Sequence, residues 1–383
     1  ITASWTPTPP SPANSRSSPT QPRPRLFMKS TPNASGRIPC TVAVSGLNNV
    51  DSPGPGMPVI RALRQSQRYD FRIVGLSYDS LEPGLYMHDL VDKSYQVPLP
   101  SAGTGALMER LRYLQSVENI DVLIPNFDAE LHNFIRLAPT LESELGIRTF
   151  LPSLQEFDAR HKAVLHEYGQ LHGVKVPVAS TVFTINEFHR ALDVSVYPLM
   201  VKGKYYDAQI AHSADEALSA FYKISAKWGL PVLVQQYVRG TEVNVTALGD
   251  GAGKCIGAVP MRKLYITDKG KAWAGVSIED PELMRLSAAL VASARWKGPC
   301  ELEYMRTDDG EYYLMEMNPR FPAWVYLAVG CGQNHPEALV DLALGQKPPA
   351  MNDYEVGKMF IRYSQDLVVS MQEFEKISTL GEL

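Results

Sequence analysis

The sequence predicts an α/β protein in which a parallel sheet flanked by helices precedes a larger part built mostly of antiparallel strands. Between residues 40 and 126, apolar strands alternate with segments whose apolar residues recur at helical spacing, a pattern typical of a parallel sheet. After Asp128 the strands are joined by short turns, and Asp308-Asp309-Gly310 turns the clearest hairpin. The 383 residues are enough for two or three such units.

Composition places few limits on the partners of the protein. Hydrophobic residues make up 45% and the formal net charge is -4, so nothing global favours nucleic acid or an anionic membrane. The longest apolar run, Ala323 to Cys331, is about half of the roughly 18 residues that a spanning helix needs. The four cysteines form no CxxC pair, which argues against zinc and disulfides and indicates a reducing, cytoplasmic setting.

Residues 1–39 differ from the rest of the chain. They are rich in proline and serine and contain no Asp or Glu, so they cannot bury enough apolar surface to fold. We expect a disordered leader or a cloning remnant, with Met28 as a possible native start. The composition is also that of a transit peptide, which is the alternative.

The predicted parallel sheet has an edge at which ligands are expected. Its strands and helices are predicted at 41–48 (strand), 57–67 (helix), 71–79 (strand), 104–118 (helix) and 121–126 (strand). Ligands of such sheets bind beyond the carboxyl ends of the strands. This rule indicates the loop from Asn48 to Gly56 and the residues Asn126 and Asp128; a plain turn and a helix cap are the alternative.

A helical segment opens the second part. Asp158 is a plausible N-cap, Gly173 a helix stop, and Leu165, Tyr168 and Leu171 an apolar stripe. The later elements are predicted at 197–203 (strand), 213–229 (helix, with a Ser-x-x-Glu cap), 231–251 (strand, turn, strand), 255–266 (strand), 280–296 (helix) and 299–320 (hairpin).

The hairpin carries the most informative residues. Glu316 and Asn318 are two apart on its second strand and face the same way, and Glu303 on the first strand can lie opposite them. Oxygen donors of this kind suit Mg²⁺. Arg320 follows in the same phase and suits a phosphate oxygen. The alternative is a solvated hairpin, but its apolar neighbours Leu302, Leu314 and Met315 favour a core position.

Two lysines and one short segment complete a predicted nucleotide site. Lys202 ends an apolar strand and Lys162 lies near the start of a helix, so both could meet phosphate. Glu242, at a strand start, could accept hydrogen bonds from ribose hydroxyls. The adjoining backbone could contact adenine over Gln235, Gln236, Tyr237 and Val238. Exposed lysines and a surface glutamate are the alternatives.

From about Phe157 to Gly345 these residues resemble the ATP-grasp fold of biotin carboxylase, carbamoyl phosphate synthetase and related carboxylate–amine ligases. The resemblance implies that ATP and Mg²⁺ are the cofactors and that Glu303, Glu316 and Asn318 hold the metal. It implies ATP-binding roles for Lys162, Lys202 and Glu242, and contact with phosphate or an acyl phosphate for Arg320. Arg262 and Lys263 are further candidates for phosphate or substrate.

The resemblance also implies a domain plan and an activity. The plan is a leader (1–39), a Rossmann-like domain (40–152), a small lid subdomain (153–236) and a large subdomain with the metal hairpin (237–383). The implied activity is an ADP-forming ligase that joins a small-molecule or peptide carboxylate to an amine through an acyl phosphate. A bicarbonate-using carboxylase or carbamoyl-phosphate-type enzyme, a kinase acting on a hydroxyl, and a non-catalytic ATP-binding module are the alternatives. A homodimer is possible, and neither nucleic acid nor a membrane is an expected partner.

Three departures from the family pattern affect the expected substrate. The loop after Lys202 has one glycine and two tyrosines where the family is glycine-rich. Gln235 and Gln236 stand where a glutamate is common. Phe321 and Trp324 are expected to narrow an acceptor pocket, which favours an organic acid or a peptide over bicarbonate.

Overall fold

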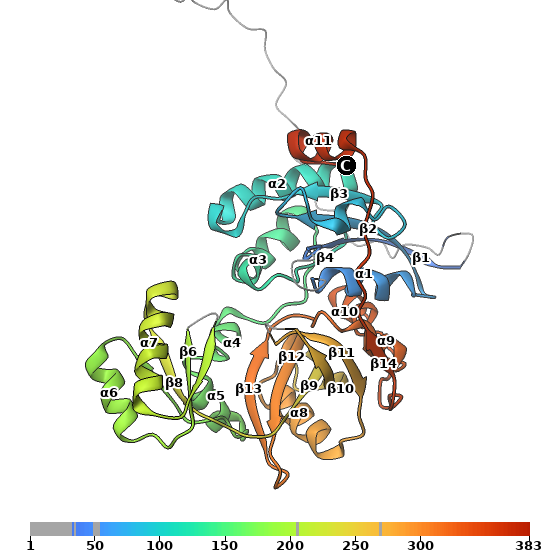
Figure 1. The fold of residues 1–383 in the computed structure, drawn as a ribbon. Coiled ribbons are helices and arrows are strands. Elements are labelled where there is room, and N and C mark those ends of the chain that lie inside the picture. Colours follow the sequence, from blue (N-terminus) through green and yellow to red (C-terminus); the bar gives the residue numbers. More distant parts are fainter. Residues whose placement is uncertain (1–32, 34–35, 49–53, 204–206, 268–269) are drawn as a thin grey trace, which may run out of the picture.

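The computed structural model describes residues 33, 36–48, 54–203, 207–267 and 270–383 of the chain. The described residues form three sheets and confirm the predicted α/β class. In Figure 1 the first sheet and its helices lie above the other two sheets, which stand side by side. The predicted leader falls mostly on residues outside these ranges. Within the part described, none of the helices is both long and apolar enough to cross a membrane.

The first sheet is parallel, as predicted, with strand order β3-β2-β1-β4. Its strands are β1 (Ile38–Val44), β2 (Tyr69–Ser77), β3 (Lys93–Gln96) and β4 (Val122–Ile124). Its main helices are α1 (Gly56–Arg64), α2 (Gly103–Glu118) and α3 (Asp128–Thr140), and short turns of other helix types cover 83–86, 100–102 and 141–145. The sequence patterns did not reveal β3 or α3. β1 and β4 are neighbours, so the residues after them lie at one edge, where the Oγ of Ser45 accepts a hydrogen bond from the Asn126 N–H over 2.9 Å.

The second sheet is antiparallel in its described pairings and has strand order β5-β8-β6-β7. Its strands are β5 (Ala179–Val182), β6 (Leu199–Gly203), β7 (Ala208–Ala211) and β8 (Val232–Gln236), and its helices are α6 (Ile185–Asp193) and α7 (Ala214–Trp228). Leu199, Val201, Val232 and Val234 are buried in a core with residues of both helices. Alternation along the strands therefore turns Lys202 and its neighbours to the opposite face.

The third sheet has strand order β13-β12-β9-β10-β11-β14. Its strands are β9 (Thr241–Asp250), β10 (Cys255–Ile266), β11 (Ala272–Ser277), β12 (Lys297–Arg306), β13 (Tyr312–Asn318) and β14 (Met359–Ile361). The predicted strands at 231–251 belong to two different sheets, because β8 pairs within the second sheet and β9 within the third. One face of the third sheet is apolar and packs on α5 (Leu165–His172) and α8 (Pro281–Ser293).

The other face of the third sheet is polar, and a bulge in β13 sets which side chains reach it. Glu303 pairs with Glu316, whereas the next residue, Tyr304, pairs with Leu314, so Met315 is an extra residue. A bulge of this kind reverses the alternation of side chains along the strand. Leu314 consequently lies in the apolar core, although it is only two residues from Glu316.

The predicted helix from Asp158 to Gly173 is broken in the structure. Ser153, not Asp158, caps α4 (Leu154–Ala159), and a turn separates α4 from α5. Gly173 ends α5 in the left-handed conformation, as predicted. Because α5 spans only eight residues, its buried positions stop at Gly169, and Leu171 is 76% exposed rather than part of the stripe.

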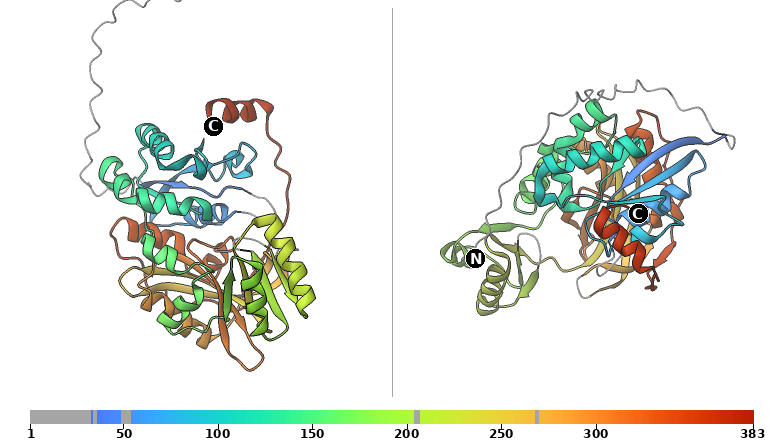
Figure 2. Two further views of the ribbon diagram at one scale, coloured as in Figure 1. Left: turned by 90° about the vertical axis from the view of Figure 1, so that its left-hand side faces the viewer. Right: turned by 90° about the horizontal axis from the view of Figure 1, so that it is seen from above.

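The C-terminal segment returns to the first sheet. After β14 it runs alongside the molecule to α11 (Met371–Leu380), which lies beside β3 and α2 (Figures 1 and 2). Ser94 and Leu383 exchange two backbone hydrogen bonds of 3.1 and 2.9 Å, and Ile377 is fully buried in the core of the first sheet. The predicted domain boundaries stay a prediction, but this helix contacts the Rossmann-like unit and not the metal hairpin. Two short helices, α9 (Tyr326–Gly330) and α10 (His335–Ala343), lie between the two parts, against α1.

Candidate functional site

The polar face of the third sheet brings the predicted metal donors together. Glu303 on β12 lies directly opposite Glu316 on β13. Two positions further along the hairpin, Asn318 is paired with Glu301. Asn318 Nδ2 donates to Glu303 Oε1 over 2.9 Å. The hairpin geometry thus matches the prediction that these three side chains face one way.

This donor set fits Mg²⁺ in its chemistry. Burial raises the pKa of Glu303, and the neighbouring carboxylates of Glu301 and Glu316 raise it further. A nearby divalent cation would reverse that effect, since it favours the ionised carboxylates. Within the described residues no cluster of three His, Cys, Asp or Glu side chains has the geometry of a metal site, and the predicted set instead combines two carboxylates with an amide oxygen.

Two lysines from different elements reach the hairpin. Lys162, in the turn between α4 and α5, forms a 3.0 Å ion pair with Glu316. Lys202 lies on the face of β6 that is turned away from the core of its own sheet. Burial lowers the pKa of Lys202 to about 8, the charge of Lys162 lowers it further, and the carboxylates of Glu316 and Glu303 oppose both effects. These interactions place Lys202 across from the metal hairpin.

A second ion pair, between Lys263 of β10 and Glu242 of β9, lies on the polar face of the third sheet. The Lys263 ammonium contacts the carboxylate of Glu242, and its Nζ also donates to the Gly270 carbonyl over 3.2 Å. Arg262 is not part of this group. It is exposed, and successive residues of a strand point to opposite faces, so Arg262 and Lys263 diverge.

The predicted adenine-binding segment connects the second and third sheets. Gln235 and Gln236 end β8, and Tyr237 and Val238 follow before β9 begins at Thr241. The Gln235 side chain is buried, and its Oε1 has no hydrogen-bond partner within the described structure. Gln236 is instead exposed, and its Oε1 accepts a long hydrogen bond of 3.4 Å from the Val178 N–H. The buried oxygen of Gln235 could therefore accept a hydrogen bond from a ligand.

Arg320 is held by two carboxylates, one on helix α3 and one on strand β12. Its Nε donates to Asp128 Oδ2 at the start of α3 over 3.0 Å, and its Nη1 donates to Glu301 Oε2 over 3.2 Å. Burial lowers the pKa of Arg320, but Asp128 and Glu301 outweigh this effect and hold it above its ordinary value. The predicted ligand edge of the first sheet, at Asp128, thereby meets the metal hairpin.

Phe321 and Trp324 do not edge an acceptor pocket, contrary to the expectation from the sequence. Phe321 is fully buried in the core beneath the first sheet. Trp324 is 5% exposed and donates its indole N–H to Glu301 Oε1 over 2.6 Å. Both rings are packed in the interior. Phe321 lies in the core of the first sheet, and Trp324 packs with apolar residues of β10 and β11 in the third sheet. These two residues therefore do not disfavour bicarbonate as a substrate.

Several residues of this site escaped the sequence reasoning. Glu301 lies two residues before Glu303 on β12. Because side chains two residues apart on a strand face the same way, the same rule that identifies Glu303 also identifies Glu301. Asn244 of β9 is paired with Glu303 and fully buried. Arg160 is placed near Asp128, Glu316 and Arg320 by the helix break before Lys162, and burial lowers its pKa. No local signal marked Arg160 or Asn244, since their neighbours come from distant parts of the chain.

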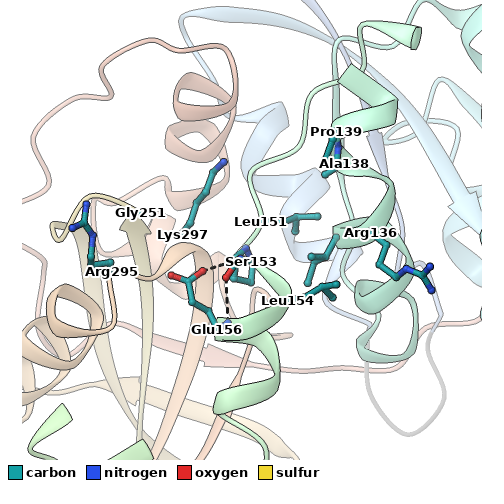
Figure 3. Close-up of a pocket in the computed structure, with 12 residues that line it drawn as sticks. Arg136, Ala138, Pro139, Leu151, Ser153, Leu154, Glu156, Gly251, Arg295 and Lys297 are labelled. Carbon is teal, nitrogen blue, oxygen red and sulfur yellow. Dashed lines mark hydrogen bonds between the residues drawn. The ribbon is translucent and has the colours of Figure 1, made fainter. Parts of the chain in front are cut away.

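A separate cavity of about 620 Å³ lies between α3, the start of α4 and the loop before β12 (Figure 3). None of the predicted site residues lines it. Its polar residues Ser153 and Glu156 bond each other in the cap of α4, and Arg136 and Arg295 point apart at opposite ends. This arrangement offers no converging groups for a charged ligand.

The fold of the described residues, in which lysines from two elements face carboxylates of the third sheet, is similar to that of ATP-grasp proteins. The family model that matches it, over residues 230–364, is ATP-grasp in the biosynthetic pathway with Ter operon. This range includes β8 to β14, and with them the hairpin of β12 and β13.

Solved structures share the fold across most of the chain. A biotin carboxylase domain of the 2-oxoglutarate carboxylase of Hydrogenobacter thermophilus, solved with MgADP and bicarbonate, is 18% identical with a TM-score of 0.64, covering 83% of this chain and 73% of that one. The L-amino acid ligase of Bacillus licheniformis is 17% identical with a TM-score of 0.58, covering 80% and 74%. The carbamoyl phosphate synthase large chain of Agathobacter rectalis is 23% identical over 61% of this chain. The chain spans only 22% of the length of that relative.

Proposed function

We propose that the protein is an ATP-dependent, ADP-forming ligase that activates a carboxylate as an acyl phosphate and transfers the acyl group to an amine. The observation that carries this proposal is the convergence of oxygen donors and cations between the lid strand β6 and the polar face of the third sheet. Glu303, Glu316 and Asn318 lie there with Lys162 and Lys202.

Each of these residues would have one of two roles, binding of the metal or binding of the phosphates. Glu303, Glu316 and Asn318 would hold Mg²⁺, which supplies charge neutralisation to the ATP phosphates. Lys162 and Lys202 approach the hairpin from two other elements and would bind phosphate oxygens. Such a site mainly positions and stabilises, since phosphoryl transfer demands little covalent chemistry of the protein.

The reaction has two steps that balance without another reagent. An oxygen of the substrate carboxylate attacks the γ-phosphorus, the bond to ADP breaks, and an acyl phosphate forms. The amine then attacks the acyl carbon, phosphate leaves, and the amine loses a proton. Arg320 lies beside the hairpin and would stabilise the charge on the transferred group.

A screen of ADP release over carboxylates and amines tests this proposal. We expect ADP and phosphate from one carboxylate in the presence of Mg²⁺ and an amine. Hydroxylamine in place of the amine should trap the acyl group as a hydroxamate. AMP as the main product would contradict the proposal, and nucleotide binding without turnover over a broad panel would favour a binding module.

Bicarbonate is the second candidate for the activated carboxylate. The biotin carboxylase domain that shares the fold was solved with bicarbonate, and the burial of Phe321 and Trp324 removes the sequence argument against it. ADP release that requires bicarbonate and no organic acid would identify this reaction. The screen therefore includes bicarbonate as one arm, in buffer freed of dissolved carbon dioxide.

Nucleotide affinity is expected to fall as the pH rises above about 8. The pKa of Lys202 is lowered to about 8, so above this pH the free protein must take up a proton to present an ammonium to phosphate. The dissociation constant of a non-hydrolysable ATP analogue with Mg²⁺ should rise by up to about tenfold per pH unit between pH 8 and 9.5. Lys202→Arg should flatten this dependence, since arginine stays protonated. A dissociation constant of the wild type that is constant over this range would refute the assignment.

A further inference from the structure

Glu301 is a buried carboxylate that lies behind the predicted metal donors. It is 6% exposed on β12, next in phase to Glu303 and paired with Asn318. We propose that Glu301 is a positioning residue that aims the Asn318 amide at the metal and the Arg320 guanidinium at the transferred phosphoryl group. This inference rests on the proposed function of the same site.

The hydrogen bonds of Glu301 use both of its oxygens. Oε1 accepts from Trp324 Nε1 over 2.6 Å and from Asn244 Nδ2 over 3.3 Å. Oε2 accepts from Asn318 Nδ2 and from Arg320 Nη1, each over 3.2 Å. An ionised carboxylate has about four lone-pair sites, so four donors saturate it. Glu301 consequently acts within the protein and not as a metal ligand.

The first consequence concerns the orientation of Asn318. Its Nδ2 donates both to Glu301 Oε2 over 3.2 Å and to Glu303 Oε1 over 2.9 Å. In both contacts a carboxylate oxygen accepts, so the amide nitrogen of Asn318 faces the two glutamates. The carbonyl oxygen of Asn318 is then turned away from Glu301, and this oxygen is the atom that would bind Mg²⁺. Glu301 therefore selects the amide orientation that a metal site needs.

The second consequence concerns the guanidinium of Arg320. Asp128 accepts from its Nε over 3.0 Å and Glu301 accepts from its Nη1, so two carboxylates fix the plane of the group. Among the described residues Nη2 has no hydrogen-bond partner, so this nitrogen could donate to an oxygen of the transferred group. The guanidinium of Arg320 is therefore held in place through Nε and Nη1, with Nη2 free to donate to an anionic oxygen. A pre-organised donor for a developing negative charge has this arrangement.

The charge of Glu301, and not only its shape, is needed for this arrangement. Every group that faces its two oxygens is a donor: Trp324 and Asn244 at one, Asn318 and Arg320 at the other. A glutamine at this position would have an NH₂ group in place of one carboxylate oxygen. That group cannot accept, so the hydrogen bonds from either Trp324 and Asn244 or Asn318 and Arg320 would be lost. Glu301→Gln is therefore an isosteric change that should disturb Asn318 and Arg320 without removing either.

Metal binding measured directly tests the proposal. Mn²⁺ replaces Mg²⁺, and its binding is followed by electron paramagnetic resonance in the presence of a non-hydrolysable ATP analogue. We expect Glu301→Gln to weaken Mn²⁺ binding at least about tenfold, while metal-free nucleotide binding changes less than about twofold. Glu311→Gln is the matched control, because Glu311 lies in the same hairpin and pairs with Lys175 near the turn. That variant should bind Mn²⁺ like the wild type.

A second variant separates positioning from a general loss of structure. Trp324→Phe keeps an aromatic ring but removes the indole donor to Glu301, so it should weaken Mn²⁺ binding in the same direction and less strongly. The double variant should lose less than the sum of the two single losses, because both act through one carboxylate. If Glu301→Gln does not fold, as judged by circular dichroism, Trp324→Phe alone decides the proposal.

The outcomes distinguish the two levels of inference. A wild-type protein that binds neither Mn²⁺ nor the nucleotide analogue would refute the proposed function. Wild-type binding together with unchanged Mn²⁺ binding in a folded Glu301→Gln, or in Trp324→Phe if the former does not fold, would refute the positioning role and leave the proposed function intact.

Discussion

Replacing Glu316 with alanine is expected to lower the rate of ADP release at least about a hundredfold, or about 3 kcal/mol of transition-state stabilisation. Glu316 lies opposite Glu303 on the polar face and forms a 3.0 Å ion pair with Lys162. Its removal would take away one of the two carboxylates proposed to bind the metal, and it would also remove the ion-pair partner of Lys162. Turnover is measured over a range of Mg²⁺ concentrations with the carboxylate that the ADP-release screen identifies.

Glu311→Ala provides the control for this experiment. Glu311 immediately precedes the second strand of the same hairpin and contacts Lys175 at the surface, with nearly half of its side chain exposed. An exposed ion pair of this kind contributes little to stability, so this variant should keep wild-type turnover. Both variants should retain the circular dichroism spectrum of the wild type. Full activity of Glu316→Ala in saturating Mg²⁺ would exclude Glu316 as a metal ligand.

Replacing Arg320 with alanine is expected to reduce ATP-dependent hydroxamate formation by about a thousandfold, on the order of 4 kcal/mol. Its guanidinium is aimed by Asp128 and Glu301 and assigned to the transferred group. A donor that acts mainly in the transition state lowers the rate more than the ground-state affinity. The dissociation constant of the Mg²⁺–nucleotide analogue complex should therefore change less than about threefold.

The geometry of Arg320 offers a sharper comparison than alanine alone. Arg320→Lys keeps the positive charge but cannot bond two carboxylates along a planar fork, so it should also lose most of the activity. Arg285→Ala is the control, since Arg285 is an exposed residue of α8 that pairs with Glu282. Equal losses of nucleotide affinity and hydroxamate formation in Arg320→Ala would show that Arg320 binds the ground-state nucleotide instead.

Local patterns in the sequence were enough to predict the α/β class, most strands and the hairpin of β12 and β13. Alternation along a strand is a local property, so Glu316 and Asn318 could be assigned to one face without a structure. The hairpin turn then placed Glu303 opposite them, as the observed pairing has it. The Ser-x-x-Glu cap at Ser213 and the stop at Gly173 were also predictable, because each depends on a few neighbouring residues.

The tertiary structure decided which of these residues meet and what holds them. Asp128 and Arg320 are 192 residues apart, and their ion pair exists only because the first sheet packs on the third. The bulge at Met315 reverses the alternation in β13, so a regular two-residue phase wrongly places Leu314 on the metal face. The sequence predicts that Trp324 edges a pocket, yet its indole N–H donates a hydrogen bond to the buried Glu301. A buried carboxylate must gather donors from whatever elements surround it, and that set is fixed by packing between distant segments rather than by local sequence.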